Sequence, residues 1–182
     1  MTLSGNKNVL AALLTGLAVA VGFVFIYIPN IELFTASVFI AGYILGPAYG
    51  ILVGVLSRLI FSLLNPMGMS SPPLLLAQLF SMLLVGWTGG LFRRLRVSGL
   101  PRVALFGVAG FLLTLIYTVL TTLSFLIVSV GFDRQKILST FAIGTIFTTV
   151  HVIGNAIIFS LLVPLILKRL DSLAQQNQLQ RQ

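Results

Sequence analysis

The chain has 182 residues, of which 58% are hydrophobic and only 8% are charged. Soluble globular domains carry about a quarter charged residues, and a soluble fold of this size would need many of them to cover its surface. The composition therefore indicates an integral membrane protein. Cysteine is absent, which excludes disulfides, thiolate metal sites and cysteine nucleophiles.

The charge balance is basic, with eleven Lys and Arg against three Asp and Glu. A basic excess can indicate nucleic acid binding, contact with acidic lipid or membrane topology. Here the basic residues fall between long apolar runs, most densely from Arg93 to Arg102, and not along one polar helix face. This placement is typical of cytoplasmic loops, so we expect no nucleic acid partner.

Six apolar segments approach the length of about 20 residues that a helix needs to cross a bilayer. They are expected at 9–28, 33–45, 49–64, 74–92, 103–130 and 137–167, separated by turn-forming residues that include Pro29, Gly46-Pro47 and 65–73. The two short segments indicate tilting or irregularity, and the two longest must tilt, protrude or break, with Gly144 and Gly154 as weak points. We expect residues 1–170 to form one all-α, six-helix transmembrane domain and residues 171–182 a frayed polar tail.

The basic residues also predict how the chain is oriented. Eight of the eleven share one side of the six-span scheme, namely Lys7, Arg93, Arg94, Arg96, Arg102, Lys168, Arg169 and Arg181. The positive-inside rule then places both termini and the loop 93–102 in the cytoplasm. The N-terminus also resembles a secretory signal peptide, but the apolar run continues past Ala18-Val19-Ala20, which favours a retained span.

Few side chains offer catalytic chemistry. Besides Lys, Arg and Tyr, the titratable residues are Glu32, Asp133, Asp171 and His151. A hydrolytic metal needs three or more protein ligands, and the two aspartates fall near opposite membrane faces in the six-span scheme. We therefore expect no enzyme, no catalytic residue, no metal site and no cofactor.

Arg58 is the most informative single residue, because it lies within the third apolar segment. A charged side chain within a span costs about 2.5 to 3.5 kcal/mol on an insertion scale. One explanation is that Arg58 meets an anionic substrate group in a cavity that opens outward. The other is that it snorkels to the outer interface or pairs with Glu32.

Other polar residues within the spans have two possible roles, in ligand binding or in helix packing. His151 and Asn155 are four residues apart and share one helix face. They either line a pocket or make a hydrogen bond that fixes helix packing. The same alternatives apply to Gln78 and Tyr117.

The first segment carries Ala12, Gly16 and Ala20 at intervals of four residues. Such a stripe of small residues lets another helix approach closely. The approaching helix belongs either to this chain or to a partner subunit, since these patterns are frequent in membrane helices.

Several stretches resemble the substrate-binding subunits of energy-coupling factor (ECF) transporters. They are Ile28-Pro29-Asn30-Ile31-Glu32, the stretch 41–50 with its Gly46-Pro47-x-x-Gly50 turn, Val53-Gly54, and Asn65-Pro66-Met67-Gly68 through Gln78 and Gly86. The number of spans, the cytoplasmic termini and the small-residue stripe are also similar. From Arg102 onward the chain is similar in hydropathy and length only.

The resemblance implies a multi-pass protein of the cell membrane that binds a vitamin or related nutrient at its outer side. It implies a lipid bilayer, a transmembrane coupling subunit and two cytoplasmic ATPase subunits as partners, with the coupling subunit docked on Ala12, Gly16 and Ala20. Cobalamin is the first expectation for the nutrient, and a pterin or a pantothenate-like acid stays open. The candidate substrate contacts are Glu32, Arg58, Asn65, Gln78, Tyr117, His151 and Asn155.

Two other classes of protein compete with this interpretation. The main alternative is a small six-span structural protein of the rod-shape complex, which would bind proteins and no nutrient. An enzyme acting on lipid is disfavoured by the missing acids and metal ligands. A cavity lined by Arg58, Gln78, His151 and Asn155 would favour the transporter subunit.

Overall fold

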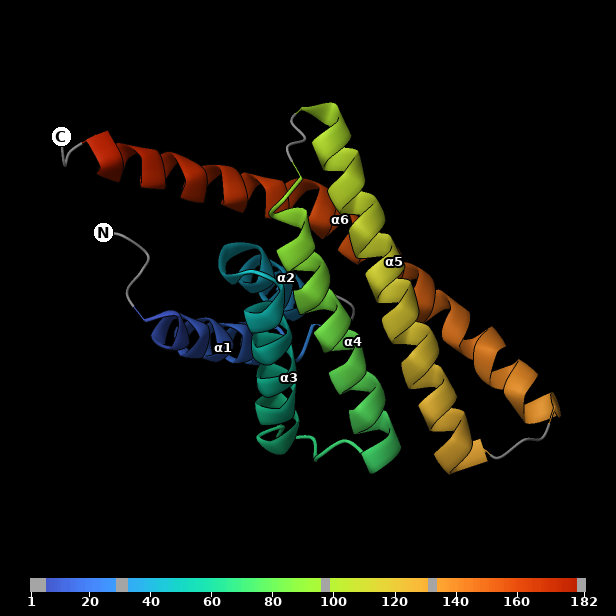
Figure 1. Ribbon diagram of the computed structural model, residues 1–182. Helices are drawn as coiled ribbons and strands as arrows, with labels where there is room; N and C mark the ends of the chain where they lie inside the picture. Colours follow the sequence, from blue (N-terminus) through green and yellow to red (C-terminus); the bar gives the residue numbers. More distant parts are fainter. Residues whose placement is uncertain (1–5, 29–32, 96–98, 131–133, 180–182) are drawn as a thin grey trace.

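The computed structural model describes residues 6–28, 33–95, 99–130 and 134–179, and every regular element within these ranges is helical (Figure 1). The helices are α1 (Lys7–Val24), α2 (Leu33–Leu45), α3 (Pro47–Leu63), α4 (Pro72–Phe92), α5 (Leu100–Phe125) and α6 (Arg134–Leu179), and a π-helical turn, η1 (Leu126–Val130), continues α5. Each segment expected to be helical is found as a helix. The predicted turn at Pro29 to Glu32 lies outside the described residues.

Four of these helices are long and apolar enough to cross a membrane, namely α1, α4, α5 with the start of η1, and α6. Helices α2 and α3 are apolar but have only 13 and 17 residues, or about 20 and 26 Å of helix. The hydrocarbon layer is about 30 Å thick. The all-helical fold is confirmed, and the apolar helices indicate a multi-pass membrane protein. Crossing by α2 and α3 stays a prediction.

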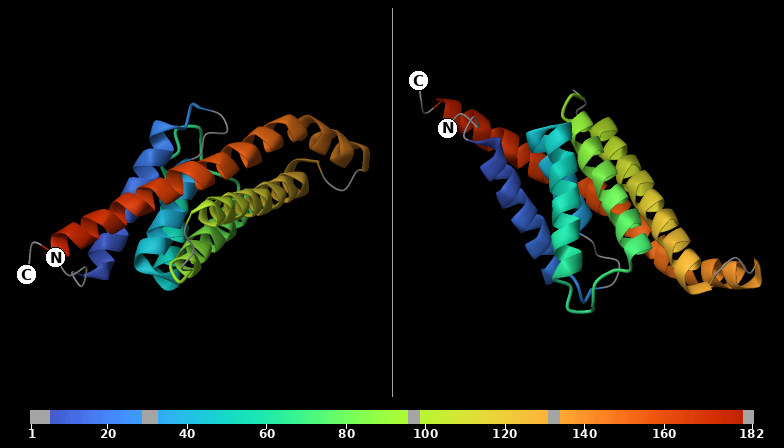
Figure 2. Two further views of the ribbon diagram at one scale, coloured as in Figure 1. Left: turned by 90° about the horizontal axis from the view of Figure 1, so that it is seen from above. Right: turned by 60° about the horizontal axis from the view of Figure 1, so that its bottom comes forward.

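The helices form a bundle centred on α2, α3 and α4, which contact one another. Helix α1 packs on α2 and α3, and on the other side α5 packs on α4 and α6 (Figures 1 and 2). Helix α6 runs obliquely behind α4 and α5 and reaches α2. The start of α1 and the end of α6 lie at the same end of the bundle (Figure 2).

Helix α6 runs for 46 residues and contains Gly144, Gly154 and Pro164 without interruption. A break at the glycines is therefore not how the long segment is accommodated. The apolar stretch 137–167 is about 46 Å long, and its oblique course matches the tilt that a layer of about 30 Å requires. Helix α6 continues to Leu179, so the first residues of the predicted tail are helical where the sequence indicated a frayed end.

Glycines bring the backbones of α3 and α4 into direct contact. A methyl group on Gly50 would overlap the carbonyl of Gly86, and one on Gly86 would overlap the carbonyl of Gly50. One turn along α3, a methyl group on Gly54 would overlap the carbonyl of Met82. Only residues without a Cβ fit here, and this close approach is how small residues hold membrane helices together.

The Gly46-Pro47 turn starts α3 at the correct place for that contact. Gly46 has a φ of 96°, in the left-handed region that favours glycine. Pro47 is the first residue of α3, where a missing N–H breaks no helical hydrogen bond. A methyl group on Gly90 of α4 would overlap the backbone of Pro47, so this corner lies directly against the end of α4.

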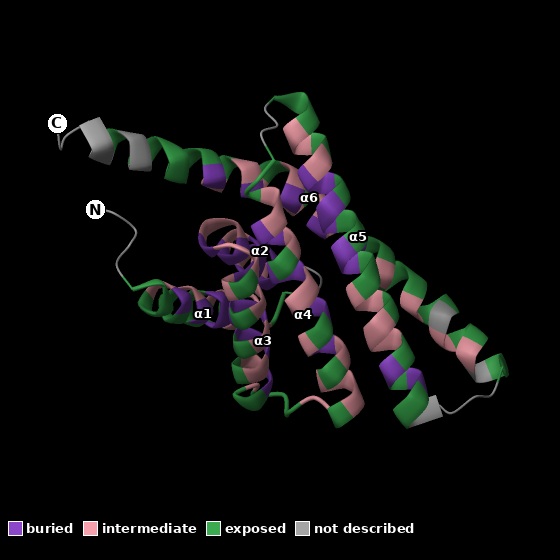
Figure 3. Cartoon of the chain, viewed as in Figure 1, coloured by how far each residue is buried: buried purple, intermediate pink, exposed green. Residues whose placement is uncertain are grey.

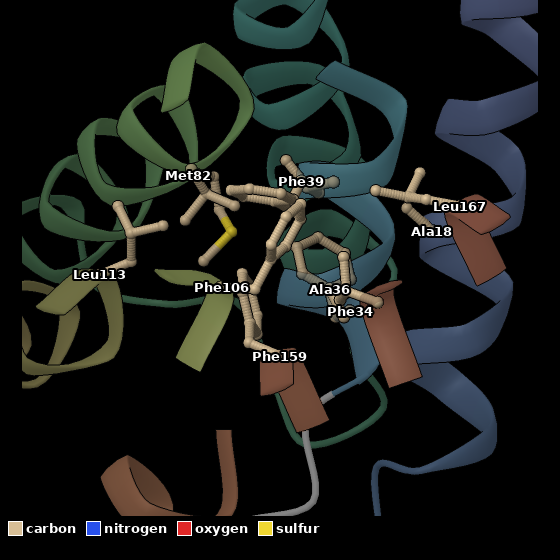
Figure 4. Close-up of a cluster of buried hydrophobic side chains, with 12 residues drawn as sticks. Ala18, Phe34, Ala36, Phe39, Met82, Phe106, Leu113, Phe159 and Leu167 are labelled. Atoms are coloured by element: carbon tan, nitrogen blue, oxygen red, sulfur yellow. The ribbon is translucent and has the colours of Figure 1, made fainter. Parts of the chain in front are cut away.

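Phe39 of α2 is the centre of an aromatic core (Figure 4). Its fully buried ring meets those of Phe92, Phe106 and Phe159 edge to face, with centroid distances of 5.3, 5.7 and 5.1 Å. The edge-to-face geometry is favourable for aromatic pairs. Because the three partner rings come from α4, α5 and α6, one side chain connects four helices.

The outward surfaces of the helices are apolar. Leu13, Phe80 and Ile146 are more than half exposed, and buried residues concentrate where helices cross (Figure 3). A soluble protein rarely exposes so many large apolar side chains in contiguous faces. These faces are suited to contact with lipid.

Candidate functional site

Arg58 lies inside the bundle with 7% of its surface exposed. The antiparallel contact between Gly54 of α3 and Met82 of α4 explains its position. One turn beyond that contact, Arg58 lies opposite Gln78, and its Nε donates a hydrogen bond to Gln78 Oε1 at 3.2 Å. Its Nη2 donates to the hydroxyl of Tyr117 at 3.2 Å, so α3, α4 and α5 meet at this guanidinium.

Three aromatic rings surround the guanidinium of Arg58. Its Cζ lies 5.3 Å from the ring centroid of Phe61, 5.8 Å from that of Phe34 and 5.9 Å from that of Tyr117. Cation–π contacts strengthen when water is excluded, so these rings stabilise the cation within the bundle. Glu32, the other partner expected from the sequence, lies outside the described residues, and that pairing stays a prediction.

Ser62 and Ser70 connect this arrangement to the turn between α3 and α4. The hydroxyl of Ser70 donates to Gln78 Oε1 at 3.0 Å, and the backbone N–H of Ser70 donates to Ser62 Oγ at 3.2 Å. Gln78 Oε1 thus accepts hydrogen bonds from both Arg58 and Ser70. Sequence reasoning missed the two serines, although Ser62 follows Arg58 by one helical turn.

His151 brings α6 into the same arrangement. Its ring meets that of Tyr117 edge to face, with centroids 5.9 Å apart. We call Arg58, Ser70, Gln78, Tyr117 and His151 the Arg58 cluster. The structure therefore brings together four of the residues that the sequence nominated separately, from α3, α4, α5 and α6.

Two nominated residues lie apart from the Arg58 cluster. The side-chain oxygen of Asn65 accepts a hydrogen bond from the backbone N–H of Met67 at 2.9 Å, so Asn65 shapes the turn after α3. Asn155 lies one turn beyond His151 in α6 and is fully buried. Neither polar atom of the Asn155 side chain has a hydrogen-bond partner, which contradicts the packing hydrogen bond considered for it.

A pocket lies between α5 and α6. It has a volume of about 440 Å³ and is open on one side. We call it the threonine pocket, since seven of its eleven lining residues are threonines: Leu115, Thr118, Val119, Thr121, Thr122, Phe125, Thr140, Gly144, Thr145, Thr148 and Thr149. Sequence reasoning missed it, although the threonines recur at helical spacing on both helices.

The threonine pocket adjoins the Arg58 cluster. Thr118 directly follows Tyr117 in α5, and Thr148 precedes His151 by about one turn in α6. The contact between the rings of Tyr117 and His151 therefore lies at the boundary between the two.

The small-residue stripe of α1 faces away from the bundle. Ala12, Gly16 and Ala20 are exposed, whereas Ala11 and Ala18 are buried. A methyl group on Gly16 would meet no atom within 4 Å. Packing within the described part of the chain therefore does not use this stripe.

The chemistry of these sites is that of ligand binding. The Arg58 cluster offers a guanidinium, an amide, hydroxyls and an imidazole, and these groups suit an anionic or polar ligand. Among the described residues, no three His, Asp or Glu side chains gather as metal ligands would.

Comparison with known proteins gives one family. A family model described as "ECF transporter, substrate-specific component" matches residues 6–167, which is most of the chain. No curated protein and no solved structure matches the chain.

Proposed function

The chain belongs to the substrate-specific components of ECF transporters, and from this premise we propose that it captures a nutrient with an anionic group at the Arg58 cluster. Membership makes it a transport component and supports substrate binding over a structural role in the rod-shape complex. The family also implies a small-molecule substrate and an ATP-driven coupling module.

The burial of Arg58 carries this proposal. A cation held within a membrane bundle is costly, and Gln78, Tyr117 and two phenylalanine rings hold it in a defined orientation. A guanidinium matches the geometry of a carboxylate or phosphate with parallel hydrogen bonds. Orienting the side chain before the ligand arrives lowers the entropic cost of binding.

The proposed orientation places the Arg58 cluster near the outer face. Arg93 at the end of α4 donates a hydrogen bond to the carbonyl of Ile44 at 3.3 Å, and Tyr49 donates to Asn8 Oδ1 at 2.8 Å. These bonds join the helix ends that lie beside Lys7, Arg93 and Arg94. The Arg58 cluster is bonded to the turn at the opposite end through Ser70. The positive-inside rule assigns the basic end to the cytoplasm, with six helices crossing and both termini inside the cell.

The exposed stripe of α1 is the proposed contact for the coupling subunit. Ala12, Gly16 and Ala20 leave room for another helix to approach closely, and no helix of the described chain occupies that face. Two cytoplasmic ATPase subunits complete the proposed importer, which works in the cell membrane.

The identity of the nutrient rests on resemblance alone. Cobalamin stays the first prediction, with pterins and pantothenate-like acids as alternatives. A ligand that binds the folded protein raises its melting temperature. Thermal stabilisation by a panel of water-soluble vitamins that includes these compounds identifies the substrate.

The proposed orientation predicts opposite labelling of two turns. Met69 in the α3–α4 turn and Leu95 after α4 are both exposed, and the native chain contains no cysteine. A membrane-impermeant maleimide added to intact cells should label Met69→Cys and spare Leu95→Cys until the membrane is permeabilised. Labelling of both variants from outside would contradict the orientation.

Bulk on the small-residue stripe should disrupt assembly. We expect Gly16→Leu to abolish co-purification with the coupling subunit while substrate affinity stays within about twofold, because the new side chain blocks helix approach. Leu17→Phe adds bulk at an exposed position about 100° around α1 from Gly16 and should preserve the complex. Loss of folding in Gly16→Leu, seen by size exclusion, would argue for an internal role of the stripe.

Removing the buried cation should weaken binding of the vitamin that the panel identifies. A hydrogen bond to a charged group is worth about 1.5 to 3 kcal/mol, so Arg58→Ala should lower affinity by roughly tenfold to over a hundredfold in calorimetry. Arg58→Lys should recover only part of the lost affinity, since lysine lacks the planar guanidinium that makes two parallel hydrogen bonds. Arg94→Ala, an exposed arginine after α4, serves as the control. Unchanged affinity in a folded Arg58→Ala protein would refute the proposed site.

A further inference from the structure

We propose that the threonine pocket receives an uncharged part of the substrate that carries N–H or O–H donors, such as an aromatic ring with ring N–H or amino groups. This inference rests on the proposed function and narrows it, because it favours a pterin-like acid over cobalamin and over a ringless pantothenate-like acid. The substrate is then an acid with two ends: an anionic group bound by Arg58 and a donor-bearing ring held between α5 and α6.

The lining of the threonine pocket excludes a charged group. All eleven described residues that line it are uncharged. A charged ligand group would lose its hydration there without gaining an ion partner, which is unfavourable. Leu115, Val119, Phe125 and the threonine methyl groups instead supply apolar surface for a ring.

The hydroxyls of the pocket present acceptors. Thr121 on α5 donates its hydroxyl hydrogen to the carbonyl of Tyr117 at 2.9 Å, and Thr149 on α6 donates to the carbonyl of Thr145 at 2.8 Å. A threonine hydroxyl has one hydrogen and two lone pairs. Once the hydrogen is donated to the helix, the oxygen can only accept, so the ligand must supply the hydrogen.

Unpartnered polar atoms lie at the buried side of the pocket. Thr118, which lines it, has a buried hydroxyl without a hydrogen-bond partner. One turn deeper, the hydroxyl of Thr114 and both polar atoms of Asn155 also have none. Buried polar groups in native proteins are nearly always paired, so these atoms indicate a place where a ligand or its bound water supplies the missing bonds.

Helix register places these atoms in one line. A methyl group on Gly107 would overlap the hydroxyl of Ser160, and one on Gly110 would press on Phe159. Farther along, Tyr117 meets His151. Thr114 lies between these contacts and therefore opposite the turn that ends at Asn155. The unpartnered atoms thus run from Thr118, which lines the threonine pocket, inward past the contact between Tyr117 and His151.

Two probe acids of similar outline test the inference. Pterin-6-carboxylic acid and 2-naphthoic acid are both flat, two-ring carboxylic acids, but only the first has ring N–H and amino donors. We expect the purified full chain to bind pterin-6-carboxylic acid at least tenfold more tightly, as measured by calorimetry. Equal affinities, or no binding of the pterin acid, would overturn the inference.

Thr118→Val tests the inference through two measurements with opposite expected effects, the melting temperature of the ligand-free protein and its affinity for pterin-6-carboxylic acid. Removing an unpartnered buried hydroxyl should leave the melting temperature of the ligand-free protein unchanged or raise it. The same change should weaken pterin-6-carboxylic acid by roughly threefold to tenfold and leave 2-naphthoic acid unaffected. Thr148→Val tests the opposite wall through the same comparison of the two ligand affinities. Thr15→Val, whose hydroxyl bonds within α1, is the matched control.

The results separate this inference from the proposed function. A vitamin that binds through Arg58 but is indifferent to Thr118→Val and Thr148→Val would overturn the inference and leave the proposed function intact. Indifference to Arg58→Ala as well would overturn both. A phospholipid that co-purifies, is seen by native mass spectrometry and resists displacement by pterin-6-carboxylic acid would identify the pocket as a lipid cleft.

Discussion

The backbone contact between α3 and α4 is the constraint on which the candidate site depends. Lipid gives no hydrophobic driving force between helices, so close packing of small residues must hold them together. The pairs Gly50–Gly86 and Gly54–Met82 fix both the distance and the register of the two helices. One turn farther, this register allows Arg58 to reach Gln78. A larger residue at Gly54 would separate the helices one turn from the point where the guanidinium is held.

The bundle is tight at its basic end and opens toward the other. Around Phe39, rings from α4, α5 and α6 meet, and Gly107 and Gly110 hold α5 closely against α6. Beyond the contact of Tyr117 with His151, the two helices leave the threonine pocket between them. Tight packing at one end of the bundle and a pocket with polar side chains toward the other suit a protein that takes a ligand from one side of the membrane.

The sequence predicted the helices well because long apolar runs and Gly or Pro turns are local signals. The start of α3 differs by only two residues, since Pro47 can open a helix. Of the tilt, protrusion or break that the sequence left open for α6, the break does not occur, because a glycine such as Gly154 weakens a helix without ending it when neighbouring helices support it. The sequence nominated Arg58, Gln78, Tyr117 and His151, but their convergence depends on the register of α3 with α4, which hydropathy does not encode. The threonine pocket was missed because its residues are individually unremarkable and become a site only through the divergence of two helices.

Binding of an anionic group by Arg58 is the central claim, and a structure of the protein with the vitamin identified by thermal stabilisation tests it most directly. The account predicts a carboxylate or phosphate oxygen about 2.7 to 2.9 Å from a guanidinium nitrogen of Arg58, with Gln78 and Tyr117 still in contact with that side chain. A vitamin bound elsewhere on the bundle, with no atom within hydrogen-bonding distance of Arg58, would contradict it.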